Sequence, residues 1–138
     1  MPTSFSPRRT RVRLAGVDHQ PFPDGRCSVR VKLEWQGEEY SAESEGTETS
    51  QGILRAAAKA CILAAQAASE EKLQLELVGV KSVRAFDADV IITSVRGTSE
   101  RSRYRLLGSC AASPHDDIAR AGVLSTLNAL NRILEKYV

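Results

Sequence analysis

Two short segments hold most of the residues that could bind a ligand, and each comes directly before a predicted helix. Both combine small residues with hydroxyl or acidic side chains: Gly46, Thr47, Thr49 and Ser50 in the first segment, and Gly108, Ser109, Ser113, His115, Asp116 and Asp117 in the second. Free N–H groups and the positive dipole end at a helix start favour a carboxylate or phosphate. The two aspartates repel an anion but can hold an ammonium group. We therefore expect these segments to bind a small carboxylate or amino-acid effector; the alternative is that they only cap their helices.

The remaining reactive side chains give little support for catalysis or metal binding. His19 lies in a segment rich in Pro, Asp and Gly, which predicts a solvated turn. His115 follows Cys110 closely, but a nucleophilic Cys–His pair needs a third, orienting group, and no recognisable spacing supplies one. The cysteines are far apart and form no CxxC pair: Cys27, Cys61 and Cys110. We expect reduced thiols in a reducing compartment, no enzyme activity, no metal, no cofactor and a cytoplasmic location.

Length and composition place the chain among globular domains. It has 138 residues, of which 42% are hydrophobic and 26% charged, with a formal net charge of +2. This is enough chain for one domain with its own core, and the charge balance argues against a strongly polyanion-seeking protein. The most apolar run, 56–65, is too short for a membrane span. We expect a flexible N-terminal arm at 1–9, a single domain at 10–138, and no membrane partner.

An internal repeat divides this domain into two halves, about 10–69 and 73–138. Leu14, Gly16 and Val17 recur at one constant separation, and further pairs follow with small shifts: Leu14/Leu77, Gly16/Gly79, Val17/Val80, Val29/Val90, Val31/Ile92, Tyr40/Tyr104 and Arg55/Arg120. Similar order along the chain predicts similar structure in the two halves.

Each half predicts three strands followed by a helix. In the first half, alternating apolar residues predict strands on either side of a tight turn at Gln36-Gly37. Apolar residues at steps of three and four then predict a helix over 50–68. The sequence thus predicts an α+β fold, a tandem duplication of a βββα unit whose antiparallel sheets have the two helices packed on one face.

The second half repeats this order, with its helix predicted over about 116–136. Ser113 is the predicted N-cap, Pro114 the first helical residue and Asp116 the partner in a capping box. The two helices carry more apolar surface than one sheet face needs. The small residues Ala57, Ala60, Ala64 and Ala68 and the patch Ile118, Ala121, Gly122 and Ser125 supply this surface. We expect a homodimer, unless the helices cover each other within one chain.

The last helix also carries a family resemblance. Asp117-Ile118, Ala121 and 127–134 (LNALNRIL) resemble the end of the C-terminal regulatory domain of 2-isopropylmalate synthase and citramalate synthase, and 35–46 is similar to that family's first hairpin. The resemblance covers most of 11–136. It implies two βββα units related by a pseudo-twofold axis, a small feedback effector such as a branched-chain amino acid bound between them, and dimerisation. The family's catalytic barrel and its metal-binding histidines are absent. The loops after Gly46 and Gly108 differ from the family pattern, so the identity of the ligand does not transfer.

Nucleic acid is an alternative partner. The stretch 50–136 has the αβββα order of a double-stranded-RNA-binding domain, and eight arginines could contact phosphates: Arg8, Arg9, Arg11, Arg13, Arg96, Arg101, Arg103 and Arg105. However, Asp116 and Asp117 place negative charge where that domain concentrates lysines, and aromatic residues are only 5% of the chain. The expected function is a non-catalytic small-molecule-binding regulatory or dimerisation module. An RNA-binding domain and a purely structural dimer are the alternatives.

Overall fold

The computed structural model describes residues 11–70, 72–100, 102–113 and 115–137; the predicted arm at 1–9 and Pro114 lie outside them. The chain order is βββα–βββα, which confirms the predicted α+β fold class. The first sheet and helix are β1 (Arg13–Pro21), β2 (Arg26–Trp35), β3 (Glu38–Thr47) and α1 (Ser50–Ala68). The second sheet and helix are β4 (Gln74–Ala85), β5 (Ala88–Thr98), β6 (Arg103–Ala112) and α2 (Ile118–Tyr137). Both sheets are antiparallel, with their strands in chain order.

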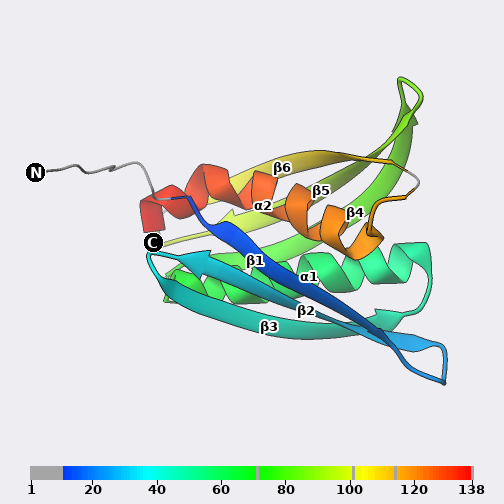
Figure 1. Cartoon of the computed structure of the whole chain (residues 1–138). Helices are drawn as coiled ribbons and strands as arrows, with labels where there is room; N and C mark the ends of the chain where they lie inside the picture. Colours follow the sequence, from blue (N-terminus) through cyan, green and yellow to red (C-terminus); the bar gives the residue numbers. More distant parts are fainter. Residues whose placement is uncertain (1–10, 71, 101, 114, 138) are drawn as a thin grey trace, which may run out of the picture.

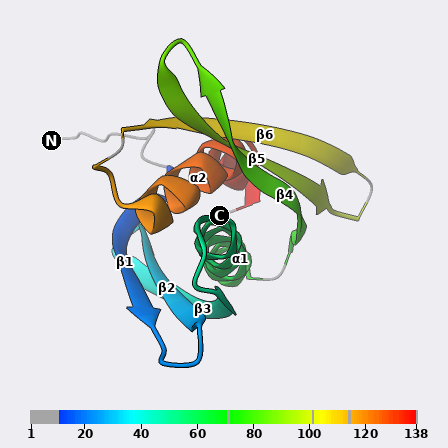
Figure 2. The same cartoon turned by 90° about the vertical axis from the view of Figure 1, so that its right-hand side faces the viewer.

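The two helices lie between the two sheets, and both begin at the same end of the molecule (Figures 1 and 2). Helix α1 packs on β2 and β3 and reaches β4, whereas α2 packs on β5 and β6 and reaches β1. The helices also pack on each other. Each sheet therefore has one face covered by helices and one outer face. Among the described residues, neither helix combines the length and the apolar character needed to cross a membrane.

The alanine face that suggested a homodimer is used within one chain. Ala57, Ala60 and Ala64 are fully buried. A Cβ added at Gly122 of α2 would lie 3.2 Å from the Cβ of Ala57, so the two helices meet closely at this point. Ser125, which belongs to the second patch that suggested a homodimer, is also fully buried. Contact between α1 and α2 therefore accounts for these residues without a second copy.

The strand register supports the duplication and corrects part of its alignment. Both halves have an irregularity at the same place, between Leu14 and Gly16 in β1 and between Leu77 and Gly79 in β4. Leu14 faces Leu33 and Leu77 faces Val95, so Leu33 and Val95 are equivalent.

The pairs Val29/Val90 and Val31/Ile92 are therefore wrong by one residue, and Tyr40/Tyr104 is wrong by two, because Tyr40 faces Leu33 whereas Leu106 faces Val95. A shift by one residue exchanges the two faces of a strand. Val31 is fully buried beneath the helices, and its equivalent there is Thr93, which is also fully buried. Because β5 has apolar residues on both faces, the sequence did not show which of them face the helices and which face outward.

Two side-chain amides mark equivalent positions in the helices. The Gln66 Oε1 atom of α1 accepts a hydrogen bond from the Leu75 N–H at 2.7 Å. The Asn131 Oδ1 atom of α2 accepts one from the Val12 N–H at 3.1 Å, and its Nδ2 donates to the Val12 carbonyl at 3.2 Å. Because Val12 and Leu75 keep the separation of the Leu14/Leu77 pair, Gln66 and Asn131 are equivalent. The predicted pair Arg55/Arg120 has the same separation as Gln66/Asn131 and agrees with this alignment.

The turn at Gln36-Gly37 is confirmed, since both residues have positive φ, at 52° and 80°. The predicted start of α2 is wrong. Asp116 Oδ2 accepts from the Ser113 N–H at 2.7 Å, as in a capping box, but these residues form a separate turn. The helix begins at Ile118 and is capped by Asp117, whose Oδ1 accepts from the Ala119 N–H at 3.0 Å. Two successive aspartates can both cap, and the sequence could not choose between them.

Candidate functional site

The predicted ligand-binding segments lie at the end of the molecule where both helices begin (Figure 2). Each helix start already has a side-chain cap from its own segment. Thr49 is the N-cap of α1: its Oγ1 accepts from the Gly52 N–H at 3.0 Å and lies 3.0 Å from the Oγ1 of Thr47. Asp117 caps α2, as described above. Ser50 is the first, exposed residue of α1, and Ser109 and His115 are also exposed.

The two glycines of these segments allow helices to approach the sheets. A Cβ at Gly108 would lie 2.2 Å from the Ser125 carbonyl oxygen and 2.3 Å from the Ala129 nitrogen of α2. A Cβ at Gly46 would lie 2.9 Å from the Gly52 carbonyl oxygen of α1. Close packing of backbone on backbone therefore explains both glycines without a ligand.

Residues of the second segment line two small cavities. One, of about 350 Å³, is lined in part by Ser113 and Asp116. The other, of about 190 Å³, is lined in part by Cys110, Asp116 and Asp117. No residue of 46–50 lines either cavity, so these cavities do not join the two predicted segments. Burial and the negative charge of Asp116 raise the pKa of the Cys110 thiol, which makes it a poor nucleophile near neutral pH.

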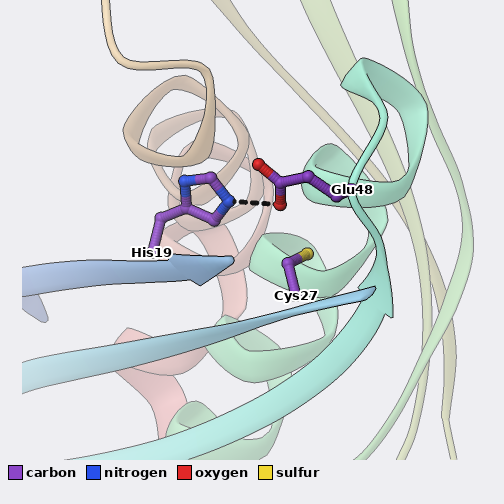
Figure 3. Close-up of side chains that lie close together, drawn as sticks. All are labelled: His19, Cys27 and Glu48. Carbon is purple, nitrogen blue, oxygen red and sulfur yellow. Dashed lines mark hydrogen bonds and ion pairs between the residues drawn. The ribbon is translucent and has the colours of Figure 1, made fainter. Parts of the chain in front are cut away.

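A cluster that the sequence did not predict lies at the same end of the molecule. His19 on β1, Cys27 on β2 and Glu48, between β3 and α1, point toward one another (Figure 3). The His19 Nε2 and Glu48 Oε1 atoms are 2.8 Å apart, and one ligand atom from each of the three residues lies within 4.8 Å of the others. Cys27 is fully buried, whereas 26% of the His19 side chain and 31% of the Glu48 side chain are exposed.

The prediction that His19 lies in a turn is wrong, although the residue is exposed as expected. Strand β1 continues to Pro21, and His19 pairs with Val29 inside the sheet. The turn signals at 21–25 lie just beyond it, and the sequence shows no sharp boundary between strand and turn. Spacing along the chain could not reveal the cluster, because two hairpin registers bring its members together: Pro21 faces Cys27, and Cys27 faces Gly46.

The cluster is unsuited to nucleophilic catalysis. Burial, followed by the hydrogen bond and charge of Glu48, raises the pKa of the Cys27 thiol. The thiol donates to the Thr47 carbonyl oxygen at 3.4 Å. The His19 nitrogen nearest to it is bonded to Glu48 instead (Figure 3). A thiol that keeps its proton and has no free base is inert, but three different donor atoms that face one another are suited to hold a cation.

Two larger grooves occupy equivalent places in the two halves. The first groove, of about 550 Å³, crosses α1 between β3 and β4. The second groove, of about 460 Å³, crosses α2 between β6 and β1. The alignment set by Gln66 and Asn131 matches their helical walls position by position: Lys59/Leu124, Ile62/Leu127, Leu63/Asn128 and Gln66/Asn131. Duplication thus produced two versions of one groove.

The two grooves differ in the side chain at one equivalent wall position. In the second groove, Asn128 Nδ2 donates to the Ser109 carbonyl oxygen at 2.9 Å and so ties α2 to β6. The equivalent residue in the first groove is Leu63, which is 47% exposed. Lys59 lies about one helical turn before it and Arg55 about two, and neither forms an ion pair with any residue that the structure describes. The first groove therefore has an open apolar floor beside two unneutralised cations.

Neither the known family models nor the curated proteins contain a match to this chain. The first groove and the His19–Cys27–Glu48 cluster are the two sites with the most defined chemistry among the described residues.

Proposed function

We propose that this protein is a non-catalytic regulatory module whose first groove binds a small ligand with a carboxylate and an apolar group. The observation that carries the proposal is the difference between the two equivalent grooves. In the second groove Asn128 is hydrogen-bonded to the Ser109 carbonyl, whereas the equivalent wall of the first groove presents the exposed Leu63 near Arg55 and Lys59. Its volume of about 550 Å³ falls within the range of small-molecule sites.

The chemistry of the groove supports an anionic ligand. Two cations four residues apart on one helix face repel each other and gain from a shared counter-charge. The acidic residue among the lining, Glu76, is already bonded to Arg96 at 3.0 Å. A carboxylate between Arg55 and Lys59 would place an attached hydrocarbon group over Leu63. This location fits a carboxylate effector better than the helix starts do, because Thr49 and Asp117 already cap those starts.

Thermal unfolding in the presence of a panel of amino acids, 2-oxo acids and short branched carboxylic acids tests this proposal. A ligand at 100 times its dissociation constant should stabilise the fold by about 2.7 kcal/mol. Lys59→Gln should abolish most of the shift. Lys81→Gln, which changes an exposed lysine on β4 that does not line the groove, is the matched control and should keep it. The proposal fails if no acid stabilises the wild-type protein or if both variants respond alike.

A second copy of this chain is the partner that the outer faces of the sheets support. By strand register, the outer face of the second sheet carries apolar residues from all three strands: Val83, Val90, Ile92, Leu107 and Ala111. Leu107 is 58% exposed and Val83 is 37% exposed. The outer face of the first sheet carries ion pairs instead, including Arg30–Glu43 and Lys32–Glu39. We propose that two copies pack these apolar sheet faces together about a twofold axis, as in sheet-on-sheet packing.

Analytical ultracentrifugation over a range of concentrations tests this pairing. The wild-type protein should form a dimer, and Leu107→Glu should shift it to the monomer because the introduced charge would be buried against a second apolar face. Ser41→Glu, on the outer face of the first sheet, is the matched control and should remain dimeric. A wild-type protein that is monomeric at every concentration would contradict the proposal.

RNA binding stays a prediction for the same chain, as does a cytoplasmic location. Helix α1, strands β4–β6 and helix α2 follow the αβββα order. Of the arginines that could contact phosphates, Arg13 lies near Glu34 at 3.9 Å and Arg96 is bonded to Glu76, whereas Arg8, Arg9 and Arg101 lie outside the described residues. A salt-dependent mobility shift of duplex RNA would favour this alternative.

A further inference from the structure

His19, Cys27 and Glu48 bring together a nitrogen, a sulfur and an oxygen donor from three separate parts of the first half (Figure 3). We propose that these three side chains bind one zinc ion, with the fourth coordination position open to solvent. The site is independent of the first groove, because none of its residues lines that groove.

The geometry requires only small movements of the side chains. Zinc binds sulfur at about 2.3 Å and nitrogen or oxygen at about 2.0–2.2 Å in tetrahedral arrangements, so its ligand atoms lie roughly 3.3–3.7 Å apart. The three donors already lie within 4.8 Å of one another. The His19 Nε2 and Glu48 Oε1 atoms, now 2.8 Å apart, would separate slightly as their hydrogen bond is replaced by two bonds to the metal.

The anchoring of the donors also favours a metal. Cys27 is fixed by the ladder of the central strand β2, and Glu48 is held where its N–H donates to the Gly25 carbonyl oxygen at 2.9 Å. The His19 and Glu48 side chains are partly exposed, which leaves a route for the ion and a position for water. Binding would release the Cys27 thiol proton to solvent, leaving a thiolate, a carboxylate and a neutral imidazole around one dication.

The donor set selects zinc rather than calcium or magnesium. Those ions prefer oxygen ligands and six or more of them, whereas a thiolate and an imidazole suit a borderline-soft ion with tetrahedral geometry. Bound there, zinc would link the β1–β2 hairpin to the start of α1 and would resist unfolding of the first half.

Titration of tag-free protein with Co²⁺ is the direct test, because cobalt reports its ligands by absorption. The expected result is one Co²⁺ per chain, with the intense near-ultraviolet band of a thiolate–cobalt bond, and loss of that band when Zn²⁺ displaces cobalt. Cys27→Ser should remove the band, whereas Cys110→Ser should keep it. Circular dichroism of each variant shows whether it is folded.

The partly exposed ligands allow a second measurement that leaves the core intact. His19→Gln and Glu48→Gln should each weaken Co²⁺ binding at least on the order of 10- to 100-fold, since even indirect ligand supports have effects of that size. His115→Gln, which changes the other histidine of the chain, should bind like the wild type. Absence of the thiolate band at one equivalent of Co²⁺, or equal affinities for His19→Gln and His115→Gln, would overturn the proposal.

Discussion

The two halves of the chain keep the same side-chain hydrogen bonds to the strand backbone, and they differ at exposed positions. Gln66 and Asn131 bond the equivalent strand residues Leu75 and Val12. One helical turn earlier, the pair Leu63/Asn128 has diverged, and only Asn128 bridges to a neighbouring strand. A duplicated fold thus provides its own internal control, because a feature shared by both halves is explained by folding, and a feature of one half alone is a candidate for function.

The same comparison separates the outer faces of the two sheets. On the outer face of the first sheet, bases on β2 pair with acids on β3, whereas the outer face of the second sheet carries Val90 and Ile92 on β5 and Leu107 on β6. Exposed ion pairs contribute about 0–1 kcal/mol each and keep a sheet face solvated. An apolar sheet face gains free energy only when something covers it. The halves therefore differ in what they can bind, although their topology is the same.

The largest predicted effect concerns how closely each helix approaches its sheet. Gly108 faces the backbone of α2, and its equivalent in the first half is Ala42, where α1 leaves room for a Cβ. Gly108→Ala should destabilise the fold by about 3 kcal/mol, because a Cβ 2.2 Å from a helix carbonyl forces α2 away from the sheet. Urea unfolding followed by circular dichroism measures the change.

The reciprocal variant is the control for this prediction. Ala42→Gly should cost only about 0.5–1 kcal/mol, the usual effect of glycine in place of alanine within a regular element. Equal losses in the two variants would show that α1 and α2 approach their sheets equally, and would remove this difference between the halves.

The second prediction compares the two amides. Asn131 is nearly buried and satisfies both the N–H and the carbonyl of Val12, whose exposure is 2%. Asn131→Ala should cost about 2–3 kcal/mol because it leaves buried polar groups without partners. Gln66→Ala removes one bond to Leu75 from a partly exposed site and should cost about 1 kcal/mol. Thermal or urea unfolding can rank the two variants by their loss of unfolding free energy. A larger loss for Gln66→Ala than for Asn131→Ala would contradict the prediction that the amide of the second half contributes more to stability.

The fold could be predicted because its signals are local and repeated. The helix over 50–68 and the turn at Gln36-Gly37 follow from periodicity and backbone preference, and the structure confirms both. The register of β5 could not be predicted, because Val90, Ile91 and Ile92 are apolar on both faces. The prediction of where α2 begins was wrong for a different reason. Ser113, Asp116 and Asp117 all have side chains that can cap a helix, and which of them caps α2 depends on how the preceding turn folds.

The sites could be predicted less well than the fold. Helix starts are visible in a sequence, so Thr49 and Asp117 were found, although the structure gives both of them capping roles. The His19–Cys27–Glu48 cluster depends on two strand registers, and the first groove depends on two edge strands that flank α1. Such sites arise from contacts between segments that are distant in the chain, and neither spacing nor composition records those contacts.

The smallest predicted effect concerns one acid on the outer face of the first sheet. The buried Ser28 hydroxyl donates to Glu43, and this hydrogen bond, together with the nearby Arg30, lowers the pKa of the Glu43 carboxyl below its ordinary value. A lowered pKa in the folded state means that the ionised carboxyl stabilises the fold above the ordinary glutamate pKa. That contribution is lost as the pH falls through the lowered value.

Carboxyl carbon NMR across an acid titration measures this pKa directly, which is preferable to unfolding because Glu43 is exposed and its energetic contribution is small. Ser28→Ala should raise the pKa of Glu43 toward the ordinary value, since the largest cause of the shift is removed. Ser109→Ala changes the position in the second half that is equivalent to Glu43 and should leave the pKa of Glu43 unchanged. If Glu43 titrates at the ordinary glutamate value in the wild type, its contacts with Ser28 and Arg30 do not form in solution. The ordered ion pairs that distinguish the outer face of the first sheet from that of the second would then be contradicted.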